Sequence, residues 1–552
     1  MKVLLVAVNA KYIHSNLAVY DLKAYTENIP VEVELAEYTI NQQQEEILRD
    51  IYEHKADVVA FSCYIWNITY VKALAEELHK IAPQVQIWFG GPEASYDAKQ
   101  LLRELSYVEL VIVGEGEETF AQLLQKHLLD KERLENIVGI CYRENTGEIC
   151  DNGIREYLPM DKIPFVYHNL DRFAHKILYY ETSRGCPFRC SYCLSSIDKR
   201  VRLRSLSLVF PELQFFLDHK VDQVKFVDRT FNCNHEHAYE IWKYLLEHDN
   251  GITNFHFEVA ADLLREEDFA LFAQMRKGLI QLEIGIQSTY PDTITEIRRV
   301  MDVGKVAECV ARVKKMHNIH QHLDLIAGLP FETFAQFQQS FNDVYAMRPD
   351  QLQLGFLKVL KGSYMHEKVE EYDLKYRGKA PYEVLSTKWL SYSDVLRLKG
   401  VEDMVEVYYN SRQFLKTLKL FEQEFGNAFS MYEYMAQYYD ENHLTGLNHS
   451  RLARYEIFHD LIRQRVGEEK PGAFEDALMC DLYLRENAKS RPAFALAQAP
   501  YKEEIRRLVP ELRTLGTQIH VEVLRLGEIL LFDYREKDRL NHNAKLTVLG
   551  RI

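Results

Sequence analysis

The chain has 552 residues, of which 47% are hydrophobic, and a formal net charge of −15 at pH 7. Its length suggests about three or four domains, and its hydrophobic content is ordinary for a globular protein. Residues 371–552 hold 27 basic and 28 acidic side chains, so nearly all of the negative charge lies in segment 1–370, which disfavours nucleic acid as a partner.

Segment 1–130 alternates apolar strands with more polar helices. Apolar, β-branched runs predict strands at 2–9, 31–39, 57–64, 85–91 and 110–117, and the segment 67–82 is typical of the helices between them. Such alternation predicts an α/β domain with a doubly wound parallel sheet and helices on both faces. Ligands in these sheets bind beyond the carboxyl ends of the strands.

Three strand ends carry unusual residues: SCYIWN at 62–67, GGPEAS at 90–95 and VGEGEETF at 113–120. The G-x-G-x-x-G fingerprint is missing after the first strand, which disfavours NAD. The order of motifs resembles instead the cobalamin-binding domain, a Rossmann-like fold, that precedes many radical S-adenosylmethionine (SAM) domains. Small residues let a backbone approach a bulky ligand closely. The resemblance implies cobalamin contacts at Gly90, Gly91, Pro92, Glu93, Gly114, Glu115 and Gly116.

The lower face of cobalt is expected to have no histidine ligand. The D-x-H-x-x-G motif of better-known cobalamin domains is absent, and His14 lacks the flanking Asp and Gly. We interpret His14 as an exposed or capping residue. In the methylating radical SAM group, which the chain resembles, a bulky side chain can stand near cobalt, and Tyr64 and Trp66 are candidates. Alternatively, Trp66 begins the next helix and packs on the sheet.

Residues 131–175 are expected to form a hairpin and a linker. Two short β-like runs flank Asn145-Thr146-Gly147, a sequence typical of a tight turn. The following segment, LPMDKIPFVYHNLD at 158–171, is interpreted as an irregular bridge to the next domain.

Three cysteines with the spacing C-x3-C-x2-C fall close together in one segment: Cys186, Cys190 and Cys193. A closed zinc site needs four ligands, and no nearby histidine or second C-x2-C pair supplies one. Clustered thiolates suit an iron–sulfur centre. With Tyr192 before the third cysteine, the motif resembles the signature of the radical SAM superfamily. The resemblance implies a 4Fe–4S cluster on these cysteines, SAM on its fourth iron, and Tyr192 beside the SAM adenine.

Residues 176–370 are expected to form the partial (βα)6 barrel of the radical SAM family. Apolar runs predict strands at 177–185, 221–228, 254–260, 279–288, 321–330 and 352–360, with helices between them. Functional groups of βα barrels gather at the carboxyl ends of the strands, and the conspicuous residues of this region stand there.

Two of these strand ends resemble SAM-binding segments of the family. VKFVDRTFN at 224–232 places Asp228 near the methionine end of SAM, where a carboxylate can accept hydrogen bonds from the amino group. FHFEVA places Glu258 near the ribose or the substrate. The alternatives are a strand cap for Asp228 and an exposed ion pair for Glu258.

The later strands carry further resemblances. GIQS places Gly285 and Gln287 under the ligand, and in the segment after it either Arg298 or Arg299 could face the SAM carboxylate, although each could equally lie on the surface. DLIAGLPFET resembles the family's D-x-I-x-G-L-P-G-E-T. Phe331 stands where the family has glycine, which puts the geometry of this turn in question.

Residues 371–552 are mostly helical in pattern and end in a β-like run at 521–536. They resemble the C-terminal domain of unknown function found in proteins of this architecture. Aromatic platforms can stack RNA bases, but we favour helix packing and a pocket wall as the role of the tyrosines. Six of them cluster here: Tyr408, Tyr409, Tyr432, Tyr434, Tyr438 and Tyr439.

The resemblance implies a cobalamin-dependent methyltransferase that uses a 5′-deoxyadenosyl radical and methylcobalamin. Its expected partners are a small molecule or peptide with an unactivated carbon and an external low-potential electron donor. A rearrangement or cyclisation without methyl transfer is the first alternative. RNA modification is the second, and it is weaker because methylthiotransferases carry an additional N-terminal cluster domain with its own cysteines, whereas segment 1–130 contains only Cys63.

The sequence predicts a cytoplasmic protein without a membrane segment. MKVLLVAVNA lacks the apolar core and cleavage site of a signal peptide, and no run approaches the roughly 18 apolar residues of a transmembrane helix. The nine cysteines are odd in number and six stand singly, so reduced thiols are expected.

Overall fold

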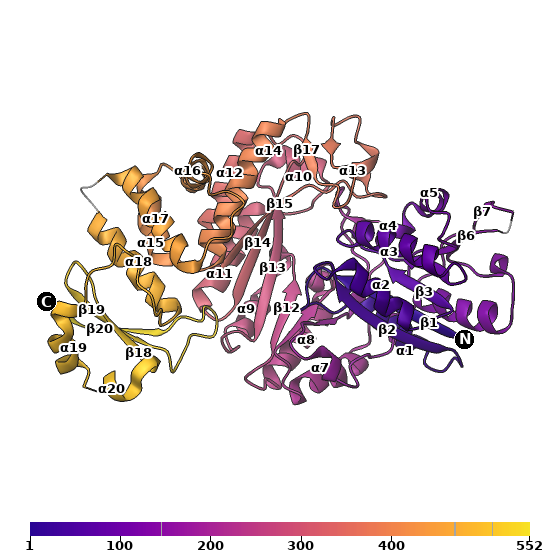
Figure 1. Cartoon of the computed structure of the whole chain (residues 1–552), viewed down its shortest axis with the longest axis horizontal. Helices are drawn as coiled ribbons and strands as arrows, with labels where there is room; N and C mark the ends of the chain where they lie inside the picture. The colour runs from indigo at the N-terminus through magenta and orange to yellow at the C-terminus, as the bar shows by residue number, and fades with distance from the viewer. Residues whose placement is uncertain (145, 468–470, 511, 552) are drawn as a thin grey trace. The chain divides into compact units, whose positions relative to one another are not determined.

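The computed structural model describes residues 1–144, 146–467, 471–510 and 512–551 (Figure 1). The chain divides into two compact units. The first unit comprises Met1–Gln274, Thr295–Met301 and Leu357–Lys388. The second comprises Met275–Ile294, Asp302–Phe356 and Trp389–Ile552. Among the described residues, no helix combines the length and the apolar character needed to cross a membrane.

A sheet with the strand order β2-β1-β3-β4-β5-β6-β7 forms the N-terminal part of the first unit. Strands β1 to β5 are parallel, while β6 and β7 are antiparallel. The direction of the connections reverses at β1 and β3, where doubly wound sheets bind ligands. The strands are β1 (Lys2–Asn9), β2 (Glu32–Thr39), β3 (Val58–Ser62), β4 (Gln86–Gly90), β5 (Leu110–Ile112), β6 (Ile140–Arg143) and β7 (Ile149–Asp151).

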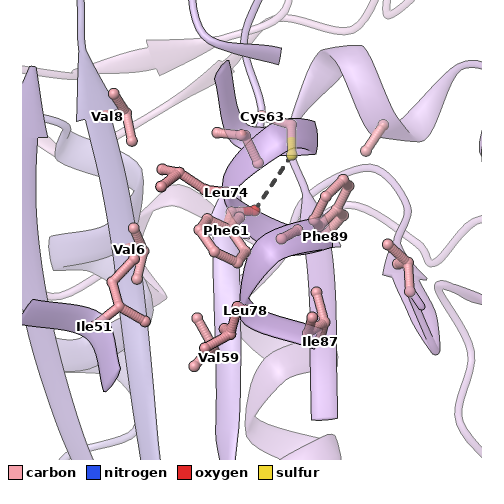
Figure 2. Packing of buried hydrophobic residues seen from close by; sticks show 14 of the residues in the cluster. Val6, Val8, Ile51, Val59, Phe61, Cys63, Leu74, Leu78, Ile87 and Phe89 are labelled. Carbon is pink, nitrogen blue, oxygen red and sulfur yellow. Dashed lines mark hydrogen bonds between the residues drawn. The ribbon is translucent and has the colours of Figure 1, made fainter. Parts of the chain in front are cut away.

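Helices cover this sheet, as the sequence predicts. Apolar side chains of β1, β3 and β4 pack against α2 and α3 in the cluster of Figure 2, where Phe61 and Phe89 make an edge contact with ring centroids 5.8 Å apart. Val3 and Leu5, which alternate with this face along β1, are buried as well. The helices are α1 (Leu17–Tyr25), α2 (Gln44–Glu53), α3 (Ile68–Ile81), α4 (Pro92–Ser95), α5 (Ala98–Glu104) and α6 (Glu117–Gln122).

Strand β5 and the β6–β7 hairpin differ in how they compare with the sequence predictions. The strand expected at 110–117 ends at Ile112, because Gly114 takes a left-handed φ of 80° and begins a loop. Strands β6 and β7 pair as a hairpin, but the predicted turn includes Asn145, which lies outside the described residues.

Three further parallel strands complete the first unit, with β11 (Gln223–Phe226) between β8 (Leu178–Tyr180) and β12 (Asn254–Glu258). The core behind them is aromatic: Phe226 and Phe257 lie with ring centroids 4.4 Å apart, and Trp242 is fully buried. The remaining elements are β9 (Ser183–Arg184), β10 (Arg202–Leu203), α7 (Leu206–Asp218), α8 (His235–Glu247), α9 (Glu266–Phe272), α13 (Tyr364–Glu367), β16 (Lys375–Tyr376) and β17 (Val384–Ser386).

The second unit begins with three parallel strands, with β14 (His320–Ala327) between β13 (Ile280–Gln287) and β15 (Gln351–Phe356). Buried Leu282, Ile284 and Ile286 alternate with half-buried polar residues on β13, so one face packs on helices and the other is polar. The helices here are α11 (Val303–Met316) and α12 (Phe334–Ala346), and α10 (Pro291–Glu296) leads back into the first unit.

The C-terminal part of the second unit is mostly helical. Its elements are α14 (Tyr392–Met404), α15 (Leu415–Phe421), α16 (Ala428–Glu441), α17 (Arg451–Val466), α18 (Pro471–Arg485), α19 (Lys502–Leu508), α20 (Leu512–Leu515), and the antiparallel strands β18 (Ile519–Val523), β19 (Glu528–Asp533) and β20 (Lys545–Arg551). Tyr408, Tyr409, Tyr432 and Tyr439 are buried. The Tyr408 and Tyr439 hydroxyls lie 2.9 Å apart, which supports packing rather than a base-stacking surface.

A buried carboxylate joins two of these helices. Asp481 of α18 is only 2% exposed, and it accepts hydrogen bonds from the backbone N–H groups of Lys416 and Thr417 and from the Thr417 hydroxyl. These N–H groups belong to the first turn of α15, which has no earlier carbonyl partner for them. Burial raises the pKa of Asp481 to about 7.

Candidate functional site

The three clustered cysteines lie in one loop of the first unit. The short antiparallel pair β9 and β10 closes the loop, with Arg184 opposite Arg202. Cys186 and Cys190 are buried, Cys193 is half-buried, and all three are free thiols. Three thiols on one short loop fit a 4Fe–4S cluster with one open iron.

A glycine is required at the base of this loop. Gly185 has a φ of 90°, and a Cβ there would lie 2.1 Å from the carbonyl oxygen of Arg200. The N–H of Cys186 donates to the carbonyl of Asp198 at 3.1 Å. The two ends of the loop, at residues 185–186 and 198–200, are therefore in direct backbone contact next to the first cysteine.

Arg299 extends its guanidinium to the cysteine loop. Its Nη1 lies 3.7 Å from Cys190 Sγ and donates to the Tyr192 hydroxyl at 3.2 Å. Burial raises the pKa of the Cys190 thiol, and the positive charge of Arg299 opposes this rise. Arg298 takes a different direction, since it is exposed and lies 3.6 Å from the ring centroid of Tyr364.

Asp228 anchors the strand that leads into the loop. It follows β11, is 1% exposed, and accepts hydrogen bonds from Thr182 N at 3.1 Å, Thr182 Oγ1 at 2.7 Å and Ser183 Oγ at 2.6 Å. Burial raises its pKa to about 6, against the effect of these hydrogen bonds. Sequence reasoning missed Thr182 and Ser183, although their hydroxyls directly precede the R-G-C triplet.

The other predicted SAM contacts lie at strand ends. Glu258 is the last residue of β12 in the first unit and is half-buried. In the second unit, Gly285 of β13 pairs with Asp324 of β14, and the register of this pairing shifts between Gly285 and Gln287. Gln287 has a φ of 74°. Their contact with SAM stays a prediction.

The turn that contains Phe331 keeps the backbone that a glycine would favour. Phe331 has a φ of 62°, and its ring lies 4.8 Å from that of Trp389. Next to it, the Glu332 carboxylate accepts hydrogen bonds from Ser288 at 2.6 Å and Ser340 at 2.8 Å. Burial raises the pKa of Glu332 to about 7. All of these residues belong to the second unit.

An aromatic pair stands at the carboxyl edge of the N-terminal sheet. Tyr64 and Trp66 stack with ring centroids 4.4 Å apart and an angle of 9° between the planes. Trp66 is 42% exposed, and its Nε1 donates to the carbonyl of Val8 at 3.2 Å. The helix that follows, α3, begins only at Ile68, so the pair belongs to the loop. A flat, partly exposed aromatic surface at this edge fits the corrin of cobalamin.

His14 contacts residues at the start of β8 in the same unit. Its Nδ1 lies 2.6 Å from the Tyr179 hydroxyl, and its backbone forms a bridge with Ile177. Burial lowers the pKa of His14. His14 is half-buried, so its interpretation as an exposed or capping residue misses a structural role that only the tertiary fold creates.

The GGPEAS loop is packed tightly against its neighbours. Gly91 has a φ of 97°, and a Cβ there would lie 2.6 Å from the carbonyl oxygen of Cys63. Gly90 accepts a hydrogen bond from Cys63 N at 2.7 Å, and Pro92 begins α4. Glu93 is 8% exposed and accepts a hydrogen bond from the Tyr382 hydroxyl at 2.9 Å.

In the VGEGEETF loop, the carboxylates bind arginines that flank the cysteine loop. Arg184 donates to Glu117 at 2.7 Å and lies 3.9 Å from Asp21 and 3.7 Å from Glu115. Arg202 pairs with Glu115. Because the Glu115 carboxylate pairs with Arg184 and Arg202, a cofactor would contact this loop through its backbone at Gly114 and Gly116.

Residues 357–388 form a strap across this part of the first unit, which sequence reasoning missed. Lys361 Nζ lies 2.8 Å from Asp97 Oδ2, and a Cβ on Gly362 would lie 2.6 Å from Tyr96 Cδ1. Met365 N donates to the carbonyl of Ser191 in the cysteine loop at 2.9 Å. The strap therefore contacts both the loops of the N-terminal sheet and the cysteine loop.

Comparison with known proteins gives relatives over the N-terminal and central parts of the chain. An uncharacterized methyltransferase of Pyrococcus horikoshii is 26% identical over 298 residues, which are 52% of this chain and 64% of the relative. The cobalamin-dependent radical SAM methyltransferase TokK of Streptomyces tokunonensis is 24% identical over 347 residues, or 59% of this chain and 50% of TokK. The chain thus spans between half and two thirds of the length of these relatives.

The fold also resembles a solved structure. The cobalamin-dependent S-adenosylmethionine radical enzyme OxsB, with aqua-cobalamin and SAM bound, superposes with a TM-score of 0.57 at 16% identity, over 93% of this chain and 81% of OxsB. Residues 3–124 match the B12 binding domain, residues 180–344 the radical SAM superfamily, and residues 370–543 a family described as a protein of unknown function, DUF4080. Three family models therefore match successive parts of this chain, in the order B12 binding domain, radical SAM superfamily and DUF4080.

Proposed function

We propose that this protein is a cobalamin-dependent radical SAM methyltransferase that acts on an unactivated carbon of a small molecule or peptide. The observation that carries the proposal is Arg184. It directly precedes the cysteine loop, and its guanidinium binds Glu117 of the VGEGEETF loop. The candidate cobalamin loops and the candidate cluster loop are thereby joined in one unit, as a reaction that uses both cofactors needs.

The residues present suit three cofactors. Cys186, Cys190 and Cys193 would hold the 4Fe–4S cluster, and the aromatic pair of Tyr64 and Trp66 would lie against the corrin. For SAM we propose candidates in the first unit: Tyr192, Asp228, Glu258 and, of the two neighbouring arginines, Arg299, since Arg298 is exposed and lies over the ring of Tyr364. When bound, the cluster with SAM supplies a radical that removes a hydrogen atom, and cobalamin supplies the methyl group.

The chain itself positions and shields these groups. Asp228 holds the strand before the cysteine loop through three hydrogen bonds. The strap lies on the N-terminal loops at Gly362 and on the cysteine loop at Ser191, where it would help to exclude water from a radical. We propose that the chain consists of a cobalamin-binding domain at 1–130, a hairpin and linker at 131–175, a radical SAM barrel at 176–370 and a C-terminal domain at 371–552.

The substrate class rests on charge, and the proposal of methyl transfer rests on a relative. Segment 1–370 holds nearly all of the net charge of −15, so a polyanion such as RNA would gain little affinity from counterion release. TokK is named a methyltransferase. We also propose an external low-potential donor, because each reductive cleavage of SAM consumes one electron that the cluster must regain.

The test is anaerobic reconstitution with iron, sulfide and cobalamin, followed by incubation with methyl-labelled SAM, a low-potential reductant and a cell extract. We expect label in the small-molecule or peptide fraction, with 5′-deoxyadenosine and S-adenosylhomocysteine formed together. A variant with all three loop cysteines replaced by alanine is the control and should form no 5′-deoxyadenosine.

Other outcomes decide between the alternatives. Label in nuclease-sensitive RNA would reject the substrate class. 5′-Deoxyadenosine without a methylated product would favour a rearrangement or cyclisation with the same cofactors.

A further inference from the structure

The two neighbouring arginines after β13 lie in different surroundings. Arg299 reaches Cys190 Sγ at 3.7 Å and the Tyr192 hydroxyl at 3.2 Å. Arg298 is exposed and lies over the ring of Tyr364. Of the two, Arg299 therefore is the one that contacts a sulfur we assign to the cluster.

Backbone hydrogen bonds hold the segment that carries Arg299 against the cysteine loop. Ser191 N donates to the carbonyl of Ile297 at 2.9 Å, which ties segment 295–301 to the cysteine loop through the backbone. On the other side, Met365 N donates to the carbonyl of Ser191 at 2.9 Å. Neither hydrogen bond uses the Arg299 side chain, so we expect both to persist when that side chain is replaced.

We propose that Arg299 raises the reduction potential of the 4Fe–4S cluster by donating to the sulfur of Cys190. The inference rests on the proposed function only in that Cys186, Cys190 and Cys193 hold such a cluster. Reduction adds one negative charge to the cluster, and a nearby cation with an N–H aimed at a ligand sulfur stabilises that added charge. Hydrogen bonds to the sulfurs are among the protein features that set iron–sulfur potentials.

Tyr192 fixes the orientation of the guanidinium. Its hydroxyl accepts from the same Nη1 that points to Cys190. Because the arginine fork is planar and always charged, a lysine at position 299 would keep the charge but not the same aim at the sulfur.

The experiment is a redox titration of the cluster, followed by electron paramagnetic resonance, on full-length protein reconstituted with iron and sulfide but without SAM or cobalamin. The proteins are wild type, Arg299→Gln, Arg299→Lys and Arg298→Gln. For Arg299→Gln we expect the equilibrium constant for reduction to fall about tenfold, a shift of about 59 mV to lower potential for one electron. Arg299→Lys should lie between this value and wild type.

Arg298→Gln is the matched control, because it removes the same charge from the next residue. Its reduction potential should differ from that of wild type by only a small fraction of the shift expected for Arg299→Gln. Equal shifts in both glutamine variants would show a general charge effect and overturn the proposal. So would an unshifted potential in both Arg299 variants.

The readout separates this proposal from the proposed function. A wild-type protein that assembles no cluster would reject the proposed function itself, whereas a normal cluster with an unshifted Arg299→Gln potential rejects only the role of Arg299. If Arg299→Gln binds less iron than wild type, Arg299→Lys decides, since it retains the charge. Leaving SAM out of the titration removes any effect of Arg299 on the SAM carboxylate.

Discussion

The Ser183 hydroxyl donates to the buried carboxylate of Asp228 at 2.6 Å. Ser183 lies shortly before Cys186, so this hydrogen bond ties the loop that follows β11 to the entrance of the cysteine loop. We expect Asp228→Asn to weaken this connection, since an amide nitrogen cannot accept. Hydrogen bonds to charged groups are worth about 1.5–3 kcal/mol, and the iron content after reconstitution should fall.

A double-mutant cycle tests whether the two residues act together. Ser183→Ala alone should lower the free energy of unfolding less than Asp228→Asn, because Thr182 still donates to the carboxylate. The double variant should lose less than the sum of the single variants, since contacting residues couple. Strict additivity in chemical denaturation would contradict the contact.

Gly185→Ala should prevent the cysteine loop from closing. A Cβ there would lie 2.1 Å from a backbone oxygen of Arg200, and φ is left-handed. The left-handed conformation costs an L-residue roughly 1–2 kcal/mol, and the backbone clash adds to it. Bound iron and sulfide per chain, measured after reconstitution, should fall several-fold.

Gly153→Ala is the control for Gly185→Ala. Gly153 also has a left-handed φ, of 74°, but a Cβ there meets no atom within 4 Å. This variant should carry the strain without the clash and bind iron as wild type does. Similar iron loss in both variants would mean that strain alone explains the result.

Trp66→Ala should lower cobalamin affinity on the order of tenfold, because it removes the partner of a stacked aromatic pair; such a loss corresponds to about 1.4 kcal/mol. Trp66→Phe, which retains a ring to stack on Tyr64, should bind nearly as wild type does. Spectrophotometric titration of the full chain with cobalamin measures both. Unchanged affinity in Trp66→Ala would remove the aromatic pair from the proposed corrin site.

Bound Co(II) cobalamin should show no nitrogen superhyperfine splitting, since we expect its dimethylbenzimidazole to be displaced and no protein histidine to lie on cobalt. His14 Nδ1 instead contacts the Tyr179 hydroxyl at 2.6 Å. We expect His14→Ala to leave the electron paramagnetic resonance spectrum unchanged. Clear splitting that disappears in His14→Ala would show that the histidine does reach cobalt.

The buried Asp481 should make stability depend on pH. Its folded pKa of about 7 exceeds the ordinary value of 3.8, so the folded state binds more protons than the unfolded state between these values. The free energy of unfolding should therefore fall as pH rises from about 4 to about 7. Asp481→Asn should remove this slope, because an amide does not titrate in this range.

Chemical denaturation of the full chain at pH 5 and pH 7.5 measures this slope. Asp460→Asn is the matched control, because the Asp460 side chain is 65% exposed and should leave the slope as in wild type. An Asp481→Asn protein with the wild-type slope would show that another group titrates in this range.

Features that depend on local pattern could be predicted from the sequence. The run KVLLVAVN matches β1 residue for residue, because parallel strands that are buried on both faces are continuously apolar. The cysteine motif could likewise be recognised, because its three cysteines lie within one loop. In each case the informative residues are neighbours in the chain.

Contacts between distant segments could not be predicted. Glu115 looked like a loop residue beside a cofactor, but it pairs with Arg202, which is 87 positions later. The strap contact of Lys361 with Asp97 spans 264 positions. No periodicity encodes such pairs, because charged surface side chains look alike in sequence until the fold brings two of them together.

The ion pairs of Arg184 have a thermodynamic consequence. Arg184 is covalently joined through Gly185 to Cys186, and its guanidinium lies among Asp21, Glu115 and Glu117 of the B12-binding domain. A ligand that moves these carboxylates alters the free energy of the cysteine loop, and linkage is reciprocal. If cobalamin changes the affinity for SAM by some factor, SAM must change the affinity for cobalamin by the same factor. The dissociation constant of each ligand, measured with and without the other, therefore tests whether Arg184 couples the two sites.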